Sequence, residues 1–228
     1  MARVDLIDGI APQAGSPLAM ERLQVDPDET VTVGDGVADL LLFVVQGAGS
    51  LDGDPVSEGT AVFVPAGDTA MLAATGGGLS AVVFSAGAGT DLHAPIGPRE
   101  RIVTTDQVEP GRATGSRSFQ VLFGPHNGST RATLFVGYIP PGKAPWHYHL
   151  YDEIVWVWHG PGRFHLGDEA EELPSGAAFR LTPREVHIVE NLAADREMAV
   201  LGLFTPAGSP SAAYLLPDEA AAYTAGPS

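Results

Sequence analysis

The chain has 228 residues, 44% of them hydrophobic and 18% charged, which is typical of a globular protein with a substantial core. A formal net charge of −16 argues against nucleic acid as a partner, because phosphate binding needs clustered lysine and arginine. The absence of cysteine excludes a disulfide framework and thiolate chemistry. No apolar run reaches the ~18 residues of a membrane span, and the N-terminus does not resemble a signal peptide, so we expect a soluble, cytoplasmic protein.

Short apolar runs separated by glycine and proline fill the first part of the chain. They include TVTV, DLLLFVV, TAVFVPAG and LSAVVFSAG. Runs spaced about 8–15 residues apart and bounded by turn residues predict an all-β sandwich or barrel. We assign residues 1–90 to this first predicted β unit.

A second series of apolar runs follows a segment of different composition. Residues 91–115 lack periodicity and are rich in glycine, proline and charge, which predicts a linker. Residues 116–228 then contain SFQVLF, ATLFVGYI, DEIVWVW, AAFRLTP and MAVLGLFTP, which predict a second β unit. Pro217 is placed to begin a short helical tail at the end of this unit.

The two series align with each other as an internal repeat. At an offset of 113 residues, His147 falls on Gly34, His149 on Gly36 and Glu153 on Leu40. At an offset of 117 residues, His187 falls on Ala70. A residue that the scaffold itself requires would occur in both copies. The four polar residues of the second copy are therefore additions to the scaffold, which favours a functional site.

The stretch PWHYHLYDEIVWVWHGPG carries three of these four residues. Side chains alternate between the two faces of a strand, so His147, His149 and Glu153 project to one side. Burying such groups without partners costs several kcal/mol, roughly 2–7 for a neutral polar group, so this face is either wet or occupied. Trp156 and Trp158 project to the other face, where we expect them to pack between sheets, between the two β units or at a dimer interface.

These residues resemble the two motifs of the cupin superfamily. The first motif is G-x5-H-x-H-x3/4-E-x6-G, and the chain matches it with one residue fewer after the first glycine. The second motif is G-x5-P-x-G-x2-H-x3-N, and the chain matches it except at the proline and the second glycine. The matching positions are Gly142, His147, His149, Glu153 and Gly160, then Gly176, His187 and Asn191, with Thr182 and Arg184 as the replacements. The first half keeps only the frame of the second motif, with Ala70 at the ligand position.

The resemblance implies two tandem cupin barrels (double-stranded β-helix or jelly-roll), a degenerate N-terminal one and a metal-binding C-terminal one. His147, His149, Glu153 and His187 would hold one divalent transition metal ion per chain: Fe, Mn, Ni, Zn, Co or Cu. A six-coordinate ion held by four protein ligands keeps two positions open for water, substrate or oxygen, so such a site is reactive.

Cupins with this ligand set include dioxygenases, decarboxylases, isomerases and hydrolases, so the resemblance leaves the reaction open. The first hypothesis is a dioxygenase-type oxidoreductase acting on a small carbonyl- or enol-bearing substrate. The second is a non-redox isomerase, lyase or hydrolase, and the third is a cupin that binds a small ligand without turnover. Candidate catalytic residues are Glu185 as a base, Arg180 as a carboxylate-binding group and His165 on the next strand. The expected partner is a small-molecule substrate, with no nucleic acid and no membrane, and a homodimer is a candidate assembly.

Overall fold

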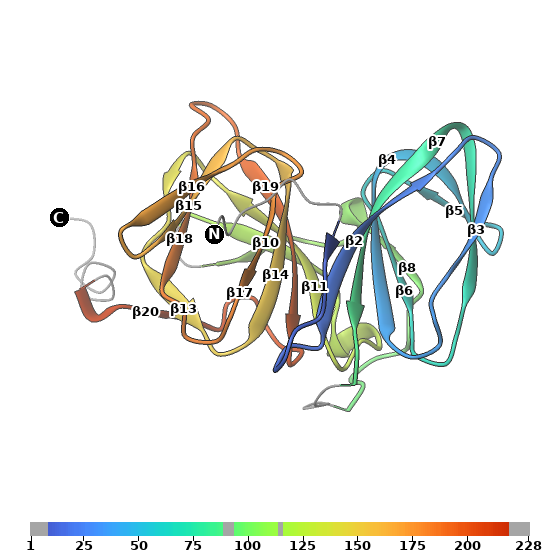
Figure 1. The fold of residues 1–228 in the computed structure, drawn as a ribbon, viewed down its shortest axis with the longest axis horizontal. Coiled ribbons are helices and arrows are strands. Elements are labelled where there is room, and N and C mark those ends of the chain that lie inside the picture. Colours follow the sequence, from blue (N-terminus) through green and yellow to red (C-terminus); the bar gives the residue numbers. More distant parts are fainter. Residues whose placement is uncertain (1–8, 89–93, 114–115, 219–228) are drawn as a thin grey trace.

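The computed structural model describes residues 9–88, 94–113 and 116–218. Regular structure in these residues is almost entirely β-strand, with two short 3-10 turns, so the predicted all-β fold is confirmed. The strands form one eight-stranded sheet in the first half of the chain and two six-stranded sheets in the second half. Figure 1 shows the two halves side by side, with the first half in blue to green and the second in green to red.

The sheet of the first half has the strand order β1-β2-β7-β4-β6-β8, with β3 on β7 and β5 on β4. Its alternate side chains gather into an apolar cluster of valine, leucine and alanine. The bounds of its strands are β1 Gly9–Ile10, β2 Leu18–Val25, β3 Thr30–Val33, β4 Asp39–Leu51, β5 Asp54–Ser57, β6 Thr60–Val64, β7 Ala70–Ala86 and β8 Ile102–Thr104.

The second half has one sheet of order β17-β14-β19-β11-β10-β9 and one of order β16-β15-β18-β13-β20, with β12 on β18. The strands of the first sheet are β9 Gly111–Arg112, β10 Ser118–Phe123, β11 Thr133–Ile139, β14 Asp152–His159, β17 Ala178–Leu181 and β19 Met198–Thr205. Those of the second are β12 Gly142–Lys143, β13 His147–His149, β15 Gly162–Leu166, β16 Glu169–Leu173, β18 His187–Asn191 and β20 Ala213–Leu215. The 3-10 turns are η1 Thr105–Gln107 and η2 Pro125–Asn127.

The predicted linker, residues 91–115, contains two of these short strands. In it, β8 pairs with β6 of the first half and β9 pairs with β10 of the second half. Its described part therefore adds an edge strand to a sheet on each side. The predicted helical tail lies mostly outside the described residues, of which Pro217 and Asp218 are helical.

Strand pairing follows the same pattern in both halves. Leu40 pairs with Val64, six residues before Ala70, just as Glu153 pairs with Leu181, six residues before His187. The four positions Leu40, Ala70, Glu153 and His187 therefore correspond as the sequence alignment predicted. The repeat seen in the sequence is present in the hydrogen-bond register of the sheets.

The alignment of His147 with Gly34 is wrong by one residue. Val33 pairs with Ala70 in the first half, as His147 pairs with His187 in the second, so Val33 is the counterpart of His147. The connection from Val33 to Leu40 is one residue longer than the connection from His147 to Glu153, and a constant offset could not show this. Gly34 follows the strand with a φ of +90°, and a Cβ there would lie 2.9 Å from the Asp68 carbonyl oxygen. Gly34 is a requirement of the turn.

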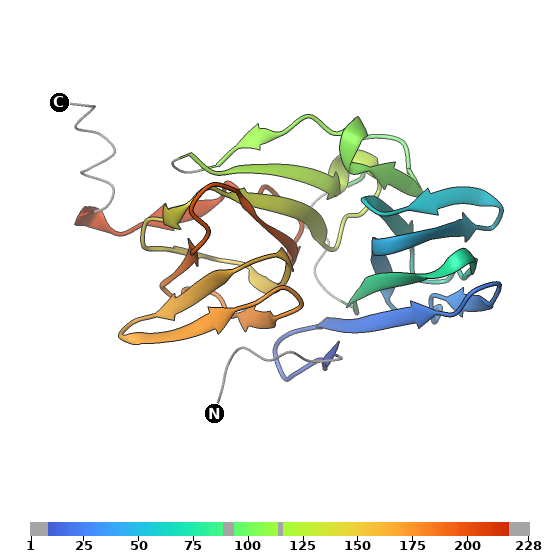
Figure 2. The ribbon, with the colours of Figure 1, turned by 90° about the horizontal axis from the view of Figure 1, so that it is seen from above.

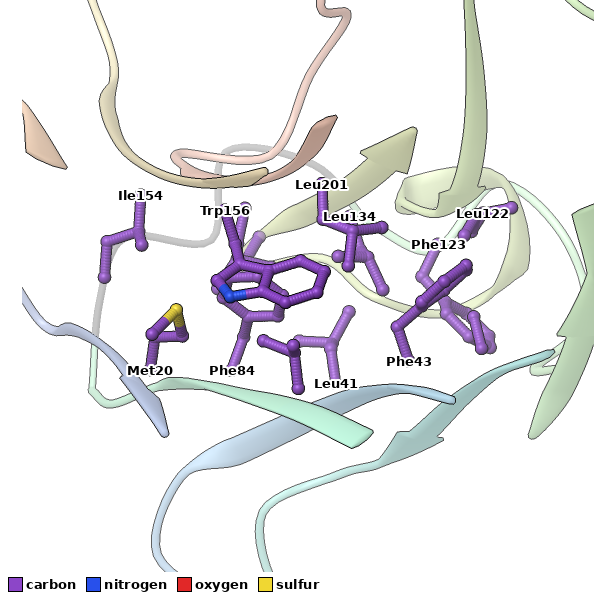
Figure 3. Packing of buried hydrophobic residues seen from close by; sticks show 14 of the residues in the cluster. Met20, Leu41, Phe43, Phe84, Leu122, Phe123, Leu134, Ile154, Trp156 and Leu201 are labelled. Atoms are coloured by element: carbon purple, nitrogen blue, oxygen red, sulfur yellow. The ribbon is translucent and has the colours of Figure 1, made fainter. Parts of the chain in front are cut away.

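A shared apolar core joins the two halves. Met20, Leu41 and Phe84 of the first half meet Ile154 and Trp156 of the second in one cluster of buried side chains (Figure 3). Trp158 packs at the edge of this cluster, with its ring 4.9 Å from that of Phe43. The prediction that both tryptophans face away from the histidines and serve packing is confirmed.

The chain before β2 also contacts the second half. Figure 2 shows this segment passing beside the strands of the second half. There the Ser16 hydroxyl donates to the Asp152 carboxylate, and the Arg180 guanidinium bonds the carbonyl oxygens of Leu18 and Ala11 at 2.8 and 3.3 Å. The contact between halves is thus apolar at its centre and hydrogen-bonded at this edge.

Candidate metal centre

Three histidines of the second half converge in the structure. Strands β13 and β18 pair with His147 directly opposite His187, and the two-residue period of a strand brings His149 to the same face as His147. One ring nitrogen from each histidine lies within 4.8 Å of the others. All three side chains are buried, with 2–7% of their surface exposed. The separation suits three ligands of one metal ion.

Hydrogen bonds to the backbone fix two of the three rings. His147 Nδ1 lies 2.8 Å from the Pro145 carbonyl oxygen, and His187 Nδ1 lies 2.9 Å from the Glu185 carbonyl oxygen. A carbonyl oxygen only accepts, so in each ring Nδ1 carries the proton and donates. Each Nε2 then keeps a lone pair available to a metal ion, which is how histidine ligands are commonly oriented.

The electrostatics of the site keep two of the imidazoles neutral. Burial above all, together with the charges of His187 and Arg117, lowers the pKa of His147 to about 3 and that of His149 to about 2. A metal ion binds the neutral form of histidine, so no proton has to be displaced from these two rings at neutral pH.

Glu153, on β14, lies beside His149 and lines the same cavity as the three histidines. Its carboxylate is 3% exposed, and its Oε2 lies 3.3 Å from His149 Nδ1. Burial, with a smaller contribution from the charge of Asp152, raises the pKa of Glu153 to about 8. A buried carboxylate is costly unless a positive charge accompanies it, and a divalent cation would supply that charge. Three imidazoles and one carboxylate are a donor set that fits a divalent transition metal.

The four side chains line a small cavity inside the second half. Its volume is about 90 Å³, which is room for several water molecules. Most of its other walls are apolar, including Phe119, Phe135 and Leu181. The cavity therefore suits a compact ligand held by a few polar groups.

Tyr151 lines the cavity and packs against one of the histidines. Its ring stacks on that of His149, with 4.4 Å between the centroids and 12° between the planes, and on that of Phe204 at 4.1 Å. Burial and the nearby charge of Glu153 raise the pKa of Tyr151, so the phenol stays protonated. Tyr151 thus holds the His149 ring in place at the wall of the cavity.

Arg180, predicted as a substrate-binding residue, lies outside this cavity. On β17 the side chains of Phe179 and Leu181 turn inward, so alternation turns Arg180 to the opposite face. There its guanidinium lies 3.1 Å from the Asp152 carboxylate and bonds the segment before β2. The structure gives Arg180 a place between the two halves instead of at the substrate.

His165 and Glu185 are also absent from the described residues that line the cavity. His165 alternates with the inward-facing Phe164 and its Nε2 lies 2.7 Å from the Glu190 carboxylate. The Glu185 carboxylate accepts a hydrogen bond from the Thr182 backbone, and its own carbonyl oxygen orients His187. A direct catalytic role for either side chain stays a prediction, whereas the positioning of His187 comes from the Glu185 backbone.

Arg117 is a cavity residue that the sequence motifs did not indicate. It precedes β10 and lines the cavity together with the three histidines, 30 residues before the nearest of them in the chain. No motif spacing links it to the site. Pairing of β10 with β11 brings it there, and that pairing becomes visible only in the folded sheet.

Comparison with known proteins shows the fold. The sequence matches no protein-family model and no curated protein. Among solved structures, the Lactobacillus farciminis oxalate decarboxylase in complex with formate has a TM-score of 0.72 and 12% identity, over 91% of this chain and 82% of that chain. A variant of the Bacillus subtilis oxalate decarboxylase gives 0.70 and 14%, over 89% and 72%. A glyoxylate-induced protein from Pseudomonas aeruginosa gives 0.69 and 15%, over 82% and 74%.

The chain therefore shares the fold of these oxalate decarboxylases, which agrees with the β-barrel fold that the cupin-like motifs led us to expect. Its group of three histidines is of the kind that binds a divalent metal ion. Within the part of the chain that the structure describes, no helix has the length and apolar character needed to cross a membrane.

Proposed function

We propose that this chain is a metal-dependent enzyme with one divalent transition metal ion, held by His147, His149, His187 and Glu153. The observation that carries the proposal is the convergence of three buried imidazoles within 4.8 Å at the wall of a cavity. Mn(II) centres are known in the Bacillus subtilis oxalate decarboxylase, which supports manganese as one candidate. Iron, nickel, zinc, cobalt and copper remain candidates from the donor set.

The substrate would be a small molecule with a carbonyl or enol group, bound in the cavity beside the ion. The ion would act as a Lewis acid and, if redox-active, as an electron donor to oxygen. The Tyr151 hydroxyl would donate a hydrogen bond to a substrate oxygen, because its raised pKa keeps it protonated. The apolar walls would exclude bulk water and strengthen each of these polar contacts.

Two reaction classes are proposed for this site, and different observations favour them. The ligand set resembles that of dioxygenase-type cupins, which supports an oxidoreductase. The structural neighbours include oxalate decarboxylases, which supports a non-redox lyase. Both classes use the same ligands, so the residues of the site do not discriminate between them.

The test starts with elemental analysis of protein purified without chelators, with one ion per chain as the expected result. Turnover of small carbonyl and carboxylate compounds is then followed with an oxygen electrode and, separately, under anaerobic conditions. Oxygen consumption coupled to substrate loss supports the dioxygenase, and anaerobic turnover supports the lyase. Protein that takes up no metal ion would contradict the whole proposal.

We further propose two tandem cupin barrels, with residues 1–90 as a degenerate barrel, 91–115 as a linker and 116–228 as the metal-binding barrel. The repeated pairing register of the two halves supports this organisation. The first half would serve as a packing partner, since Val33, Leu40 and Ala70 supply no metal ligand at the corresponding positions. Two ions per chain in the elemental analysis would contradict this part of the proposal.

A further inference from the structure

The first half contains a cavity at the position that corresponds to the metal centre of the second half. Its volume is about 640 Å³, against about 90 Å³ for the cavity beside the histidines. Val33 and Leu40, the counterparts of His147 and Glu153 in the pairing register, both line it. The two cavities therefore occupy corresponding places in the two halves, although they differ in size and in the side chains around them.

The larger cavity lies at an edge where the first half has a shorter strand. In the second half, β10 has six residues and pairs with β11, and residues of both strands line the metal cavity. In the first half the corresponding strand, β1, has two residues and pairs with β2. The first half thus has less strand at this edge. Its cavity has the volume that pockets for organic molecules usually have, about 300–1,000 Å³.

A carboxylate lies on the inner face of the first half, in an otherwise largely apolar wall. Along β2, alternation turns Leu18 and Met20 to the core shared by the two halves and turns Glu21 and Leu23 to the inside of the first half. Glu21 and Leu23 both line the cavity. Apolar packing does not require an acid at this position, so Glu21 indicates a polar contact with a ligand.

Ser85 adds a hydroxyl next to this carboxylate. On β7 it lies two residues after Val83, which pairs with Glu21, so Glu21 and Ser85 are diagonal neighbours on one face of adjacent strands. One small ligand group can contact both side chains at that spacing, about 7–8 Å between backbones. In the part of the chain that the structure describes, neither side chain has a hydrogen-bond or ion-pair partner.

The charges around this cavity favour a cation. Glu21 and Asp35 line it, whereas no lysine or arginine is among the described residues that do so. The Asp35 carboxylate accepts hydrogen bonds from the backbone N–H groups of Ala38 and Val37, which lower its pKa and keep it charged. Residues 1–90 contain twelve acidic and two basic residues, so the surroundings add negative charge. This field attracts cations and repels anions.

We propose that the cavity of the first half binds a small organic ammonium ion. The ammonium group donates to Glu21 and Ser85, and the apolar part of the ligand packs against Leu23, Val31 and Leu40. These three apolar side chains are only partly buried against the core cluster, so a ligand removes more of their surface from water. The inference goes beyond the proposed function, and this binding does not need the metal ion.

The experiment measures the binding of three probes to the full-length protein by isothermal titration calorimetry. Benzylammonium, benzyl alcohol and benzoate share one ring and differ in the charge of the attached group. The variants are Glu21→Gln, which removes the charge, and Ala19→Phe, which fills the cavity beside Ser85. Glu58→Gln is the matched control, because Glu58 is an exposed acid of the first half and is not among the described residues lining the cavity. Circular dichroism checks the fold of every variant.

In the wild-type protein we expect benzylammonium to bind most tightly and benzoate most weakly. Glu21→Gln should weaken benzylammonium binding about 10-fold, as expected for a hydrogen bond to a charged group, and leave benzyl alcohol binding unchanged. Ala19→Phe should abolish the binding of both. Glu58→Gln should bind like the wild type. His187→Ala should also bind benzylammonium like the wild type, which separates this site from the metal centre.

Several outcomes would overturn the inference. Wild-type protein that binds no benzylammonium at millimolar concentration, or binds benzyl alcohol or benzoate equally well, has no ammonium site. Equal benzylammonium affinity in wild type and Glu21→Gln, or an equal loss in Glu58→Gln, removes Glu21 from recognition. A loss in His187→Ala but not in Ala19→Phe places the amine at the metal centre. A dimer in analytical ultracentrifugation that Ala19→Phe dissociates assigns the cavity to a second copy of the chain instead.

Discussion

The two halves of the molecule share one pairing register but differ in what fills the corresponding positions. The second half has His147, Glu153 and His187 where the first has Val33, Leu40 and Ala70. Val33 and Ala70 belong to the core cluster of the first half, and the partly buried Leu40 packs against it. The same backbone thus supports either apolar side chains or a group of polar side chains at these positions. The difference shows that the scaffold does not need the polar residues, so their presence in the second half reflects a function.

The contacts across the interface follow the same repeat. Asp39 and Asp152 are each the first residue of a corresponding strand, β4 and β14. Asp39 lies 3.7 Å from Arg131 of the second half, and Asp152 bonds Ser16 of the first half. Asp39 therefore contacts the segment before β11, and the corresponding Asp152 contacts the segment before β2. The aspartate contacts across the interface therefore correspond in the two halves, whereas the side chains in the two interiors differ.

The largest expected effect comes from removing a histidine of the second half. His187→Ala should reduce bound metal to the background level, because it removes one of the three imidazole ligands. The substitution removes no side chain of the hydrophobic core cluster. Elemental analysis measures the metal, and circular dichroism checks the fold. His159→Ala is the control, since His159 is exposed at the end of β14. Retention of a full equivalent of metal in His187→Ala would refute the proposed site.

The second test exchanges the side chains at the corresponding interior positions of the two halves. Val33→His, Leu40→Glu and Ala70→His combined should destabilise the protein by several kcal/mol without creating a second metal site. Val33 and Ala70 are buried, and an unpartnered polar group in such a position costs about 2–7 kcal/mol. The reciprocal variant His147→Val, Glu153→Leu and His187→Ala should stay folded, because buried polar groups are often replaced by apolar ones without loss of stability. Urea denaturation and metal analysis of both variants provide the measurement. A stable first-half variant with a second bound ion would mean that the halves differ less than their interiors suggest.

A smaller loss of stability is expected at the edge of the interface. Arg180→Met leaves the buried Asp152 carboxylate with only the Ser16 hydroxyl and should cost about 3–5 kcal/mol of unfolding free energy. Arg163→Met is the matched control, because the Arg163 side chain is 40% exposed and lies 4.0 Å from Glu190. Exposed pairs of that kind contribute about 0–1 kcal/mol. Equal effects in the two variants would show that Arg180 does not stabilise the contact between halves.

The smallest effect concerns pH and the metal-free protein. Glu153 has a pKa of about 8 when folded and 4.5 as its ordinary value, so the folded protein holds an extra proton between them and loses stability as pH rises through that range. His147 and His149 have folded pKa values of about 3 and 2 against 6.5, so stability falls as pH drops below 6.5. These groups together give maximal stability near pH 6.5.

Chelator-treated wild type and Glu153→Gln are compared by urea denaturation between pH 6.5 and about pH 8. The wild type should lose stability over this interval, and Glu153→Gln should lose less, because glutamine does not titrate. The corresponding residue of the first half, Leu40, contributes nothing to this dependence. An identical slope in both proteins would show that Glu153 ionises freely in the folded state.

The sequence predicted the part of the site that depends on local periodicity. The alternation of side chains correctly predicted that His147 and His149 share one face of β13. It also correctly predicted that Trp156 of β14 points away from the histidines. It failed where the number of residues in a turn matters, as at Gly34, because a one-residue insertion leaves no trace in composition. It also missed Arg117, since contacts between strands distant in sequence depend on the closed sheet. Arg180 was predicted at the substrate because it lies close in sequence to the motif residues. That prediction did not consider which face of its strand Arg180 occupies.

The core shared by the two halves has a consequence for how the molecule comes apart. Leu41, Phe43, Phe63 and Phe84 of the first half are buried entirely, or nearly so, and belong to the cluster that includes Trp156 of the second half. Expressed separately, either half would present this surface to water and tend to aggregate. The chain should accordingly melt in a single transition, and a fragment complementation experiment would need both fragments present during refolding.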